Sequence, residues 1–320
     1  MSSFPSYLID DQWIHSRRGN KNIVDLSKPY AFLVEQERSA SGVIEDTAVI
    51  FLTNNECPFH CLMCDLWKNT TENPVKPGII PGQIGNALAN IPAARQVKLY
   101  NSGSFFDKNA IPPEDFEAIA GTLEGFKTVI VESHPAFIGK NCLGFRDMLK
   151  GKLEIAIGLE TVNSELIKRL NKKMSLNLFS EKISFLSRNN INTRAFILLR
   201  PPFMTEEEGI YWAKRSIDFA FNAGVGCCTI IPVRHGNGAM DELMKLGYFS
   251  LPSIRSLEDV LEYGISLGAG RVFADTWDLR LFSECNECFQ KRVDRITEMN
   301  LNQTITPEVR CTCQVLGTGC

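Results

Sequence analysis

The feature that most constrains the fold is a repeated alternation of short apolar runs with helical stretches. The runs, rich in β-branched residues, predict strands at 47–53, 96–101, 127–132, 153–159, 193–199, 227–233 and 271–274. Helical patterns lie between them at 81–90, 113–123, 135–149, 176–188 and 205–222. Nearly continuous apolar runs suit strands covered on both faces of a parallel sheet. We therefore expect an α/β protein with a partial (β/α) barrel, whose chemistry lies at the carboxyl ends of its strands.

Composition indicates an ordinary globular chain. Its 320 residues are 44% hydrophobic and 22% charged, with a formal net charge of −3, and one α/β barrel can fill this length. Residues 1–45 are polar and are expected to form an N-terminal extension on the outside of the fold. Residues 46–280 would form the barrel and 281–320 a cysteine-rich C-terminal tail. The chain start lacks an apolar signal-peptide core and no apolar run could span a membrane, so we expect a cytoplasmic protein without a membrane partner.

Three cysteines directly after the first predicted strand indicate a metal centre. Cys57, Cys61 and Cys64 stand in CPFHCLMC, with the spacing C-x3-C-x2-C. Three thiolates so close together can bind three corners of a [4Fe–4S] cluster, which leaves the fourth iron open to a small ligand. The alternatives are a zinc site and a chance group of buried thiols. Zinc commonly takes two close pairs of ligands, and His60 lies inside the tight loop, which favours the cluster.

Small and polar residues follow the next two predicted strands. Ser102, Gly103 and Ser104 end the second strand, where small residues let backbone groups approach a ligand closely; a plain turn is the alternative. His134 ends the third strand. It is equally compatible with a contact to substrate and with a hydrogen-bonded structural histidine.

Five segments together carry a family resemblance. CPFHCLMC, NSGSFFD, ESHP, GLET and LLRPPFMTEEE follow one another within residues 48–235. The segments resemble the elongator-catalytic-subunit-like branch of the radical S-adenosylmethionine (SAM) superfamily. They are most similar to the radical SAM subunit of archaeosine synthase and its uncharacterised relatives. The resemblance implies a partial barrel, one [4Fe–4S] cluster and bound SAM, with Ser102, Gly103 and Ser104 near the SAM amino group.

Residues at the later strand ends are candidates for the rest of a SAM site. Glu160 would accept hydrogen bonds from the ribose or the amino group, since a buried acid needs a partner; an acid at a helix start is the alternative. Arg200 would meet the SAM carboxylate or an anionic substrate, or would pair with Glu160. Pro232 is expected to pack against the adenine.

A second group of cysteines predicts another metal site in the tail. Cys285 and Cys288 form one close pair and Cys311 and Cys313 another; 22 residues separate the two pairs, and Cys320 is the last residue. Two close pairs are typical of a closed tetrathiolate site. Zinc and an auxiliary iron–sulfur cluster are both compatible with this spacing, and unligated cysteines are the remaining alternative.

The resulting functional hypothesis is a radical SAM enzyme. It would cleave SAM reductively to a 5′-deoxyadenosyl radical, which abstracts hydrogen from a substrate that the sequence does not identify. A modified nucleoside or tRNA leads the substrate hypotheses, although the acidic balance weakens the tRNA case. An electron donor such as flavodoxin or ferredoxin is implied, and a partner subunit is compatible with the resemblance. The alternatives are a non-enzymatic iron–sulfur or zinc scaffold or sensor, and non-radical transfer of the aminocarboxypropyl group of SAM.

Overall fold

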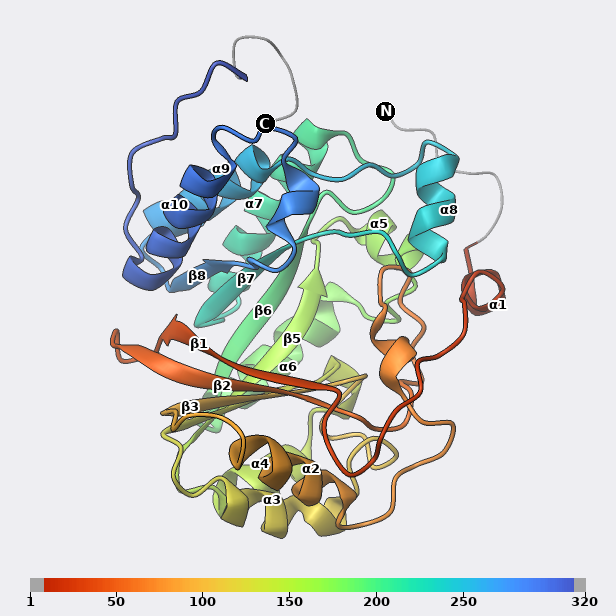
Figure 1. The fold of residues 1–320 in the computed structure, drawn as a ribbon. Helices are drawn as coiled ribbons and strands as arrows, with labels where there is room; N and C mark the ends of the chain where they lie inside the picture. Colours follow the sequence, from red (N-terminus) through yellow and green to blue (C-terminus); the bar gives the residue numbers. More distant parts are fainter. Residues whose placement is uncertain (1–8, 314–320) are drawn as a thin grey trace. The chain divides into compact units, whose positions relative to one another are not determined.

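The computed structural model describes residues 9–313 and confirms the predicted alternation of strands and helices. Eight strands form one sheet in the order in which they follow along the chain. The strands are β1 (Ala31–Arg38), β2 (Ile44–Leu52), β3 (Gln96–Asn101), β4 (Thr128–Glu132), β5 (Lys152–Glu160), β6 (Asn192–Leu199), β7 (Cys227–Pro232) and β8 (Arg271–Ala274). The seven predicted strands correspond to β2 through β8 (Figure 1).

Helices follow most of the strands. The α-helices of the described residues are α1 (Asp11–His15), α2 (Ile79–Leu88), α3 (Phe116–Thr122), α4 (Lys140–Met148), α5 (Ser164–Arg169), α6 (Leu176–Arg188), α7 (Glu206–Asn222), α8 (Ala239–Lys245), α9 (Ile254–Ser266) and α10 (Phe289–Asn302). Short 3-10 turns are η1 (Leu66–Asn69), η2 (Pro113–Asp115), η3 (Pro135–Phe137) and η4 (Leu279–Phe282). No helix within residues 9–313 has both the length and the apolar character that crossing a membrane requires.

Local sequence explains where two of the predicted helices begin. Ser175 precedes α6, and its hydroxyl accepts a hydrogen bond from the backbone N–H of Leu178. Thr205 and Glu208 form a reciprocal capping box at the start of α7, whose first turn carries three acids. Caps of this kind satisfy backbone N–H groups that have no partner inside the helix, and acids there are favoured by the helix dipole.

Backbone contacts divide the chain into two compact units. We call residues 19–158 together with 172–194 the first unit, and the described parts of 1–18, 159–171 and 195–320 the second unit. Each unit is described separately below.

The first unit is built on the start of the sheet. β2 pairs in parallel with β3, β3 with β4, and β4 with β5, while β1 pairs antiparallel with β2. α2 packs against β2, and α3 packs against both α2 and α4 (Figure 1). The strand residues facing these helices or the interior are fully buried, among them Val97, Leu99 and Val129. This burial on both faces explains why the strands read as continuous apolar runs.

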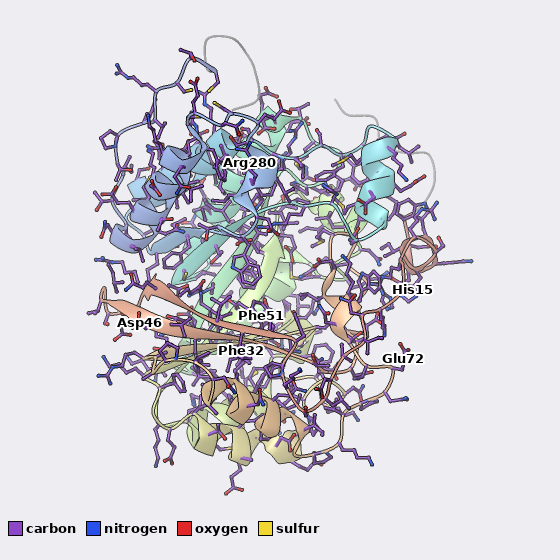
Figure 2. The ribbon with its side chains drawn as sticks, in the orientation of Figure 1. His15, Phe32, Asp46, Phe51, Glu72 and Arg280 are labelled. Atoms are coloured by element: carbon purple, nitrogen blue, oxygen red, sulfur yellow. The ribbon has the colours of Figure 1, made fainter. Side chains whose placement is uncertain are left out.

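Part of the predicted N-terminal extension differs from the expectation that it lies outside the fold. Ala31–Arg38 forms β1, with Phe32 opposite Ile50 and Ala31 opposite Phe51. Phe51 of β2 also lies with its ring centroid 5.8 Å from that of Tyr100 on β3. Phe32 and Phe51 are labelled in Figure 2. The extension therefore supplies an antiparallel edge strand, whose charged residues interrupt the apolar pattern that predicts a strand.

Those charged residues belong to a buried ion network. Arg194 of β6 donates to Glu37 of β1 at 2.6 Å and to Glu154 of β5 at 2.8 Å. Lys98 of β3 donates to Glu37 at 2.5 Å and to Glu35 at 2.6 Å. The two cations hold the pKa of the Glu37 carboxyl far below its usual range despite its burial. Removing one partner of such a network strands the opposite charge in a medium of low dielectric constant.

The second unit packs helices on the end of the sheet. β7 pairs in parallel with β8, and α9 and α10 contact β8 (Figure 1). Gly264 of α9 permits close contact, because a Cβ there would lie 2.7 Å from a methyl carbon of Val272.

Side-chain amides of α10 bind the backbone of β8. Gln303, directly after α10, accepts from the N–H of Val272 at 2.7 Å and donates to its carbonyl at 2.8 Å. Asn300 makes the same pair of hydrogen bonds with Ala274, both at 2.9 Å. An edge strand exposes unpaired backbone groups, and these two amides satisfy several of them as a neighbouring strand would.

Candidate functional site

Two side-chain amides fix the end of β2, from which the first cysteine group follows. The backbone N–H of Thr53 donates to Gln83 at 2.8 Å, and the Gln83 amide donates back to the Thr53 carbonyl at 2.9 Å. Asn54 bonds Ser102 in the same two-way manner, at 3.0 and 3.1 Å. Asn54 and Gln83 are fully buried. Asn54 thus joins the end of β2 to that of β3, and Gln83 joins the end of β2 to α2.

Cys57, Cys61 and Cys64 occupy the loop that follows; all three are half-buried, and none of them forms a disulfide. The Cys64 N–H donates to the Cys61 carbonyl at 3.1 Å, and the Phe59 N–H donates to Cys57 Sγ at 3.4 Å. Burial raises the pKa of the Cys57 thiol to about 12 and also raises the pKa of Cys64. Such thiols are neutral unless a cation stabilises the thiolate, which is what a metal centre does.

The small-residue segment after β3 lies directly against this loop. Gly103 has φ +111°, and a Cβ built on it would lie 3.0 Å from the Cβ of Cys57 and 3.3 Å from its Sγ. A side chain at this position would therefore crowd the first cysteine of the loop, which would have to shift by a few tenths of an ångström. Ser102, held by Asn54, and Ser104 flank this glycine. The structure thus brings together two segments that sequence analysis had identified separately.

His134 supports the cysteine loop with a fully bonded ring. Its Nδ1 accepts from the N–H of Ala136 at 3.2 Å, which places the proton on Nε2, 3.1 Å from the carbonyl oxygen of Lys172. Burial, assisted by the Lys172 charge, lowers the pKa of His134 to about 4. Its ring lies 4.1 Å from that of Phe59, centroid to centroid. The neutral imidazole therefore packs on the loop between Cys57 and Cys61, and its hydrogen bonds are those of a structural histidine.

The other predicted SAM-site residues belong to the second unit. Glu160 ends β5, is buried and has φ +64°, a left-handed conformation rare for a residue with a side chain. Pro232 ends β7 and is buried, and its carbonyl accepts a hydrogen bond from Arg234. Backbone strain of this kind is often found at functional sites. Glu160 is a buried acid whose backbone carries this strain.

Arg200 also has a left-handed backbone, with φ +52°. Its guanidinium donates to Glu206, in the first turn of α7, and to the Leu251 carbonyl at 2.6 Å. Glu206 in turn accepts from the N–H of Ser253 at 2.8 Å. Gly209 permits this arrangement, because a Cβ there would lie 2.8 Å from the Arg200 Cα. Arg200 is therefore paired with an acid of the TEEE segment that follows it.

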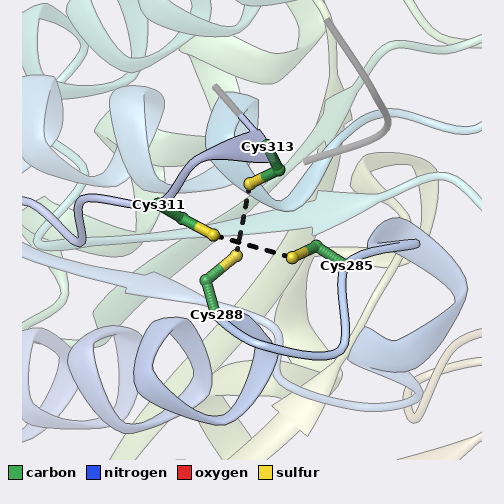
Figure 3. A group of neighbouring side chains, drawn as sticks. All are labelled: Cys285, Cys288, Cys311 and Cys313. Atoms are coloured by element: carbon green, nitrogen blue, oxygen red, sulfur yellow. Dashed lines mark hydrogen bonds between the residues drawn. The ribbon is translucent and has the colours of Figure 1, made fainter. Parts of the chain in front are cut away.

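The second cysteine group lies within the second unit. Cys285 Sγ is 3.7 Å from Cys311 Sγ, and Cys288 Sγ is 3.7 Å from Cys313 Sγ (Figure 3). The four sulfur atoms all lie within 4.8 Å of one another. Cys320 lies outside the described residues. Folding thus brings the two predicted pairs into one four-sulfur group.

Sequence analysis missed three residues that hold the first cysteine loop: Asn54, Gln83 and Phe59. Asn54 follows an apolar strand and stands three residues before Cys57. A buried amide at that point of a strand was the available signal, since such a group needs hydrogen-bond partners. Gln83 gives no comparable signal because its partner is 30 residues away.

Comparison with solved structures defines the class of fold. The chain matches methylornithine synthase (PylB) with a TM-score of 0.51 and 14% identity, over 82% of this chain and 73% of that one. It matches Elp3 of Methanocaldococcus infernus, lacking its N-terminus, with a TM-score of 0.51 and 12% identity, over 83% and 65%. These matches confirm the partial (β/α) barrel of the radical SAM type.

Comparison of sequences identifies relatives of higher identity than these solved structures. The chain is 26% identical to an uncharacterised protein of Methanocaldococcus jannaschii, over 92% of this chain and 87% of that one. It is also 26% identical to archaeosine synthase subunit beta of Methanosarcina acetivorans, over 69% and 67%. No protein-family model matches the chain. The relatives confirm the resemblance drawn from the five sequence segments.

Proposed function

We propose that this protein is a radical SAM enzyme and that Cys57, Cys61 and Cys64 ligate its [4Fe–4S] cluster. The carrying observation is the loop at the carboxyl end of β2, where Gly103 leaves room for Cys57 and no more. Each of the three thiolates would bind a different iron of the cubic cluster.

The residues around the loop have distinct proposed roles. Ser102, Gly103 and Ser104 would present backbone groups to the amino group of SAM, as small residues permit. His134 would act as a positioning residue, because it packs on Phe59 and both ring nitrogens are bonded. The cluster, when bound, supplies the electron that cleaves SAM to a 5′-deoxyadenosyl radical. The chain itself binds, orients and shields these groups.

Residues of the second unit are also candidates for binding SAM. Glu160 is the proposed acceptor for the ribose or amino group, and Pro232 the proposed contact for adenine. Both follow strands whose carboxyl ends carry chemistry in folds of this kind. Arg200 would contribute to a SAM carboxylate only through Nη2 and Nε, because its Nη1 is bound to Glu206 and Leu251.

For the substrate we propose a modified nucleoside, carried in tRNA, and a partner subunit that helps to bind it. Support comes from the likeness to archaeosine synthase subunit beta, whose name marks it as one part of a larger enzyme. A net charge of −3 is low for a chain that binds RNA alone. This charge favours a partner that carries much of the RNA contact. The electron would come from a flavodoxin or ferredoxin in a reducing cytoplasm.

The test is anaerobic reconstitution with iron and sulfide, followed by dithionite, SAM and mass spectrometry of the products. The expected product is 5′-deoxyadenosine, absent in the variant that carries Cys57→Ala, Cys61→Ala and Cys64→Ala together. Methylthioadenosine in its place would indicate aminocarboxypropyl transfer. A cluster that forms but neither binds nor cleaves SAM would contradict the enzyme assignment and favour a scaffold or sensor.

A second arm tests the substrate class. Unmodified tRNA, tRNA carrying 7-deazaguanine derivatives, and the free nucleosides are added separately to the reconstituted protein. The proposal expects faster 5′-deoxyadenosine release with the modified tRNA than with either control. Equal rates in all three would contradict a nucleoside substrate and leave a small molecule or peptide.

A further inference from the structure

The sequence spacing of the four C-terminal cysteines is compatible with both a zinc ion and an iron–sulfur cluster. The distances between their sulfur atoms distinguish these two kinds of metal centre. Around a single zinc ion the Zn–S bonds are about 2.3 Å, so the edges of the sulfur tetrahedron are about 3.8 Å. The observed Sγ–Sγ distances of 3.7 Å match that edge, and all pairs lie within 4.8 Å. In an iron–sulfur cluster the thiolates bind different irons and stand further apart. The geometry therefore fits one ion and leaves no space for a cluster.

The four thiols come from two segments that other contacts hold together. Cys288 is buried and occupies the N-cap position of α10, where the helix dipole favours negative charge. Arg292, one turn into this helix, donates from Nε to Cys288 Sγ at 3.4 Å. A hydrogen bond to a ligand sulfur orients it and offsets the excess negative charge of four thiolates around a divalent ion.

Two buried arginines of α10 also hold the segment that leads to the second pair of cysteines. Arg295 donates to the carbonyls of Pro307 and Thr306 at 2.8 and 2.7 Å, and Arg292 donates to the carbonyl of Val309 at 3.4 Å. Glu258 of α9 pairs with both arginines. The chain that leads to Cys311 is thus bound to α10 by groups other than the thiols.

We propose that Cys285, Cys288, Cys311 and Cys313 hold one zinc ion as a closed structural site. Four thiolates around one ion leave no position for a substrate, which is typical of structural zinc. The ion would fasten residues 311–313 to the start of α10 and close the loop made by that helix. Cys313 is disulfide-bonded in the structure, so it would bind zinc only after that bond is reduced. This inference is independent of the proposed reaction at Cys57, Cys61 and Cys64.

The test uses full-length protein expressed with zinc and purified anaerobically with a thiol-free reductant. Elemental analysis should find about one zinc per chain, and zinc-edge X-ray absorption should find four sulfur atoms at about 2.3 Å. The variant with Cys285→Ser and Cys311→Ser should bind at least tenfold less zinc per chain. Trypsin should also cleave it several-fold faster after Arg310, which lies exposed beside Cys311.

The triple alanine variant of the first cysteine group is the matched control and should keep its zinc. A single Cys313→Ser variant removes one ligand instead of two. It should still bind zinc through three sulfur atoms, with lower affinity than the wild type. Iron and sulfide that remain in the triple alanine variant would overturn the proposal in favour of an auxiliary cluster. Zinc below a tenth of an equivalent in the reduced wild type would overturn it as well, whether or not SAM is cleaved.

Discussion

The two cysteine groups differ in how the chain assembles them. Cys57, Cys61 and Cys64 lie within eight consecutive residues, and a glycine and a histidine from other strand ends pack against their loop. The four C-terminal cysteines come from two segments and already lie at the spacing of a single ion. The first group has an odd number of thiols and neighbours that could receive a ligand. The second has a full set of four.

This difference indicates how each group should respond to damage. The first depends on the packing around its loop, because three ligands in one short segment do not define their own geometry. The second depends on the metal to join segments that are 22 residues apart in sequence. Substitutions near the first group should therefore affect cluster and activity, and leave the second group unchanged.

Cys61→Ala should abolish SAM cleavage, because the cluster would lose one of three protein ligands. We expect 5′-deoxyadenosine at the level of a reaction without protein, while bound zinc stays unchanged. Cys142→Ala, which removes a buried thiol of α4, is the control and should retain cleavage. Loss of zinc in the Cys61 variant would break the separation between the two groups.

Asn54→Ala should lower the free energy of unfolding by about 1–3 kcal/mol, because the backbone of Ser102 loses its partners in a buried place. Iron bound after reconstitution should fall with it, and zinc should not. Denaturant unfolding and elemental analysis measure the two effects. Asn90→Ala removes an exposed amide bonded to the Asn86 carbonyl and should change stability by less than about 0.5 kcal/mol. Equal effects of the two substitutions on the free energy of unfolding would contradict the role given to the hydrogen bonds between Asn54 and Ser102.

Acid should weaken the support that His134 gives to the first group. Because its folded pKa of about 4 lies below the ordinary 6.5, the neutral ring stabilises the fold above pH 6.5, and this stability is lost as the pH falls toward 4. The loss at pH 5 amounts to about 2 kcal/mol. We therefore expect the stability difference between wild type and His134→Gln to shrink by that amount between pH 7 and pH 5. A difference that does not change with pH would mean that His134 does not titrate as described.

Gly103→Ala should cost about 1–2 kcal/mol, because alanine is strained at positive φ and its Cβ would meet Cys57. Thermal unfolding and the iron content after reconstitution are the readouts. Gly121→Ala in α3 is the matched control: its φ is ordinary and no atom lies within 4 Å of an added Cβ. It should be neutral or slightly stabilising. Normal iron content in the Gly103 variant would show that the cluster tolerates a wider loop.

Sequence analysis predicted the parallel strands because burial on both faces leaves a local signal of apolar, β-branched residues. It did not predict β1, where Glu35 and Glu37 interrupt the apolar pattern. Their partners, Lys98 and Arg194, lie about 60 and 157 residues further along the chain. No local pattern reports a pairing over that distance. The helix α9 was missed as well, although Ser253 caps its start.

The candidate site shows the same limit. The spacing of cysteines predicted two groups, since metal ligands often come in short motifs. It did not predict that Arg200 binds Glu206 six residues later, because a strand end followed by an acid-rich helix permits several pairings. Nor did spacing distinguish one ion from a cluster in the tail. That distinction required distances between sulfur atoms.

The amides of Asn300 and Gln303 on β8 have a consequence for how the chain behaves in a crowded solution. An uncovered last strand offers a template on which another molecule can add a strand, and from which fibrous assemblies can grow. Here the hydrogen bonds that a visiting strand would make are already used by α10. Replacing both amides with leucine would keep their bulk and free this backbone, so such a chain should show concentration-dependent self-association that the natural one resists.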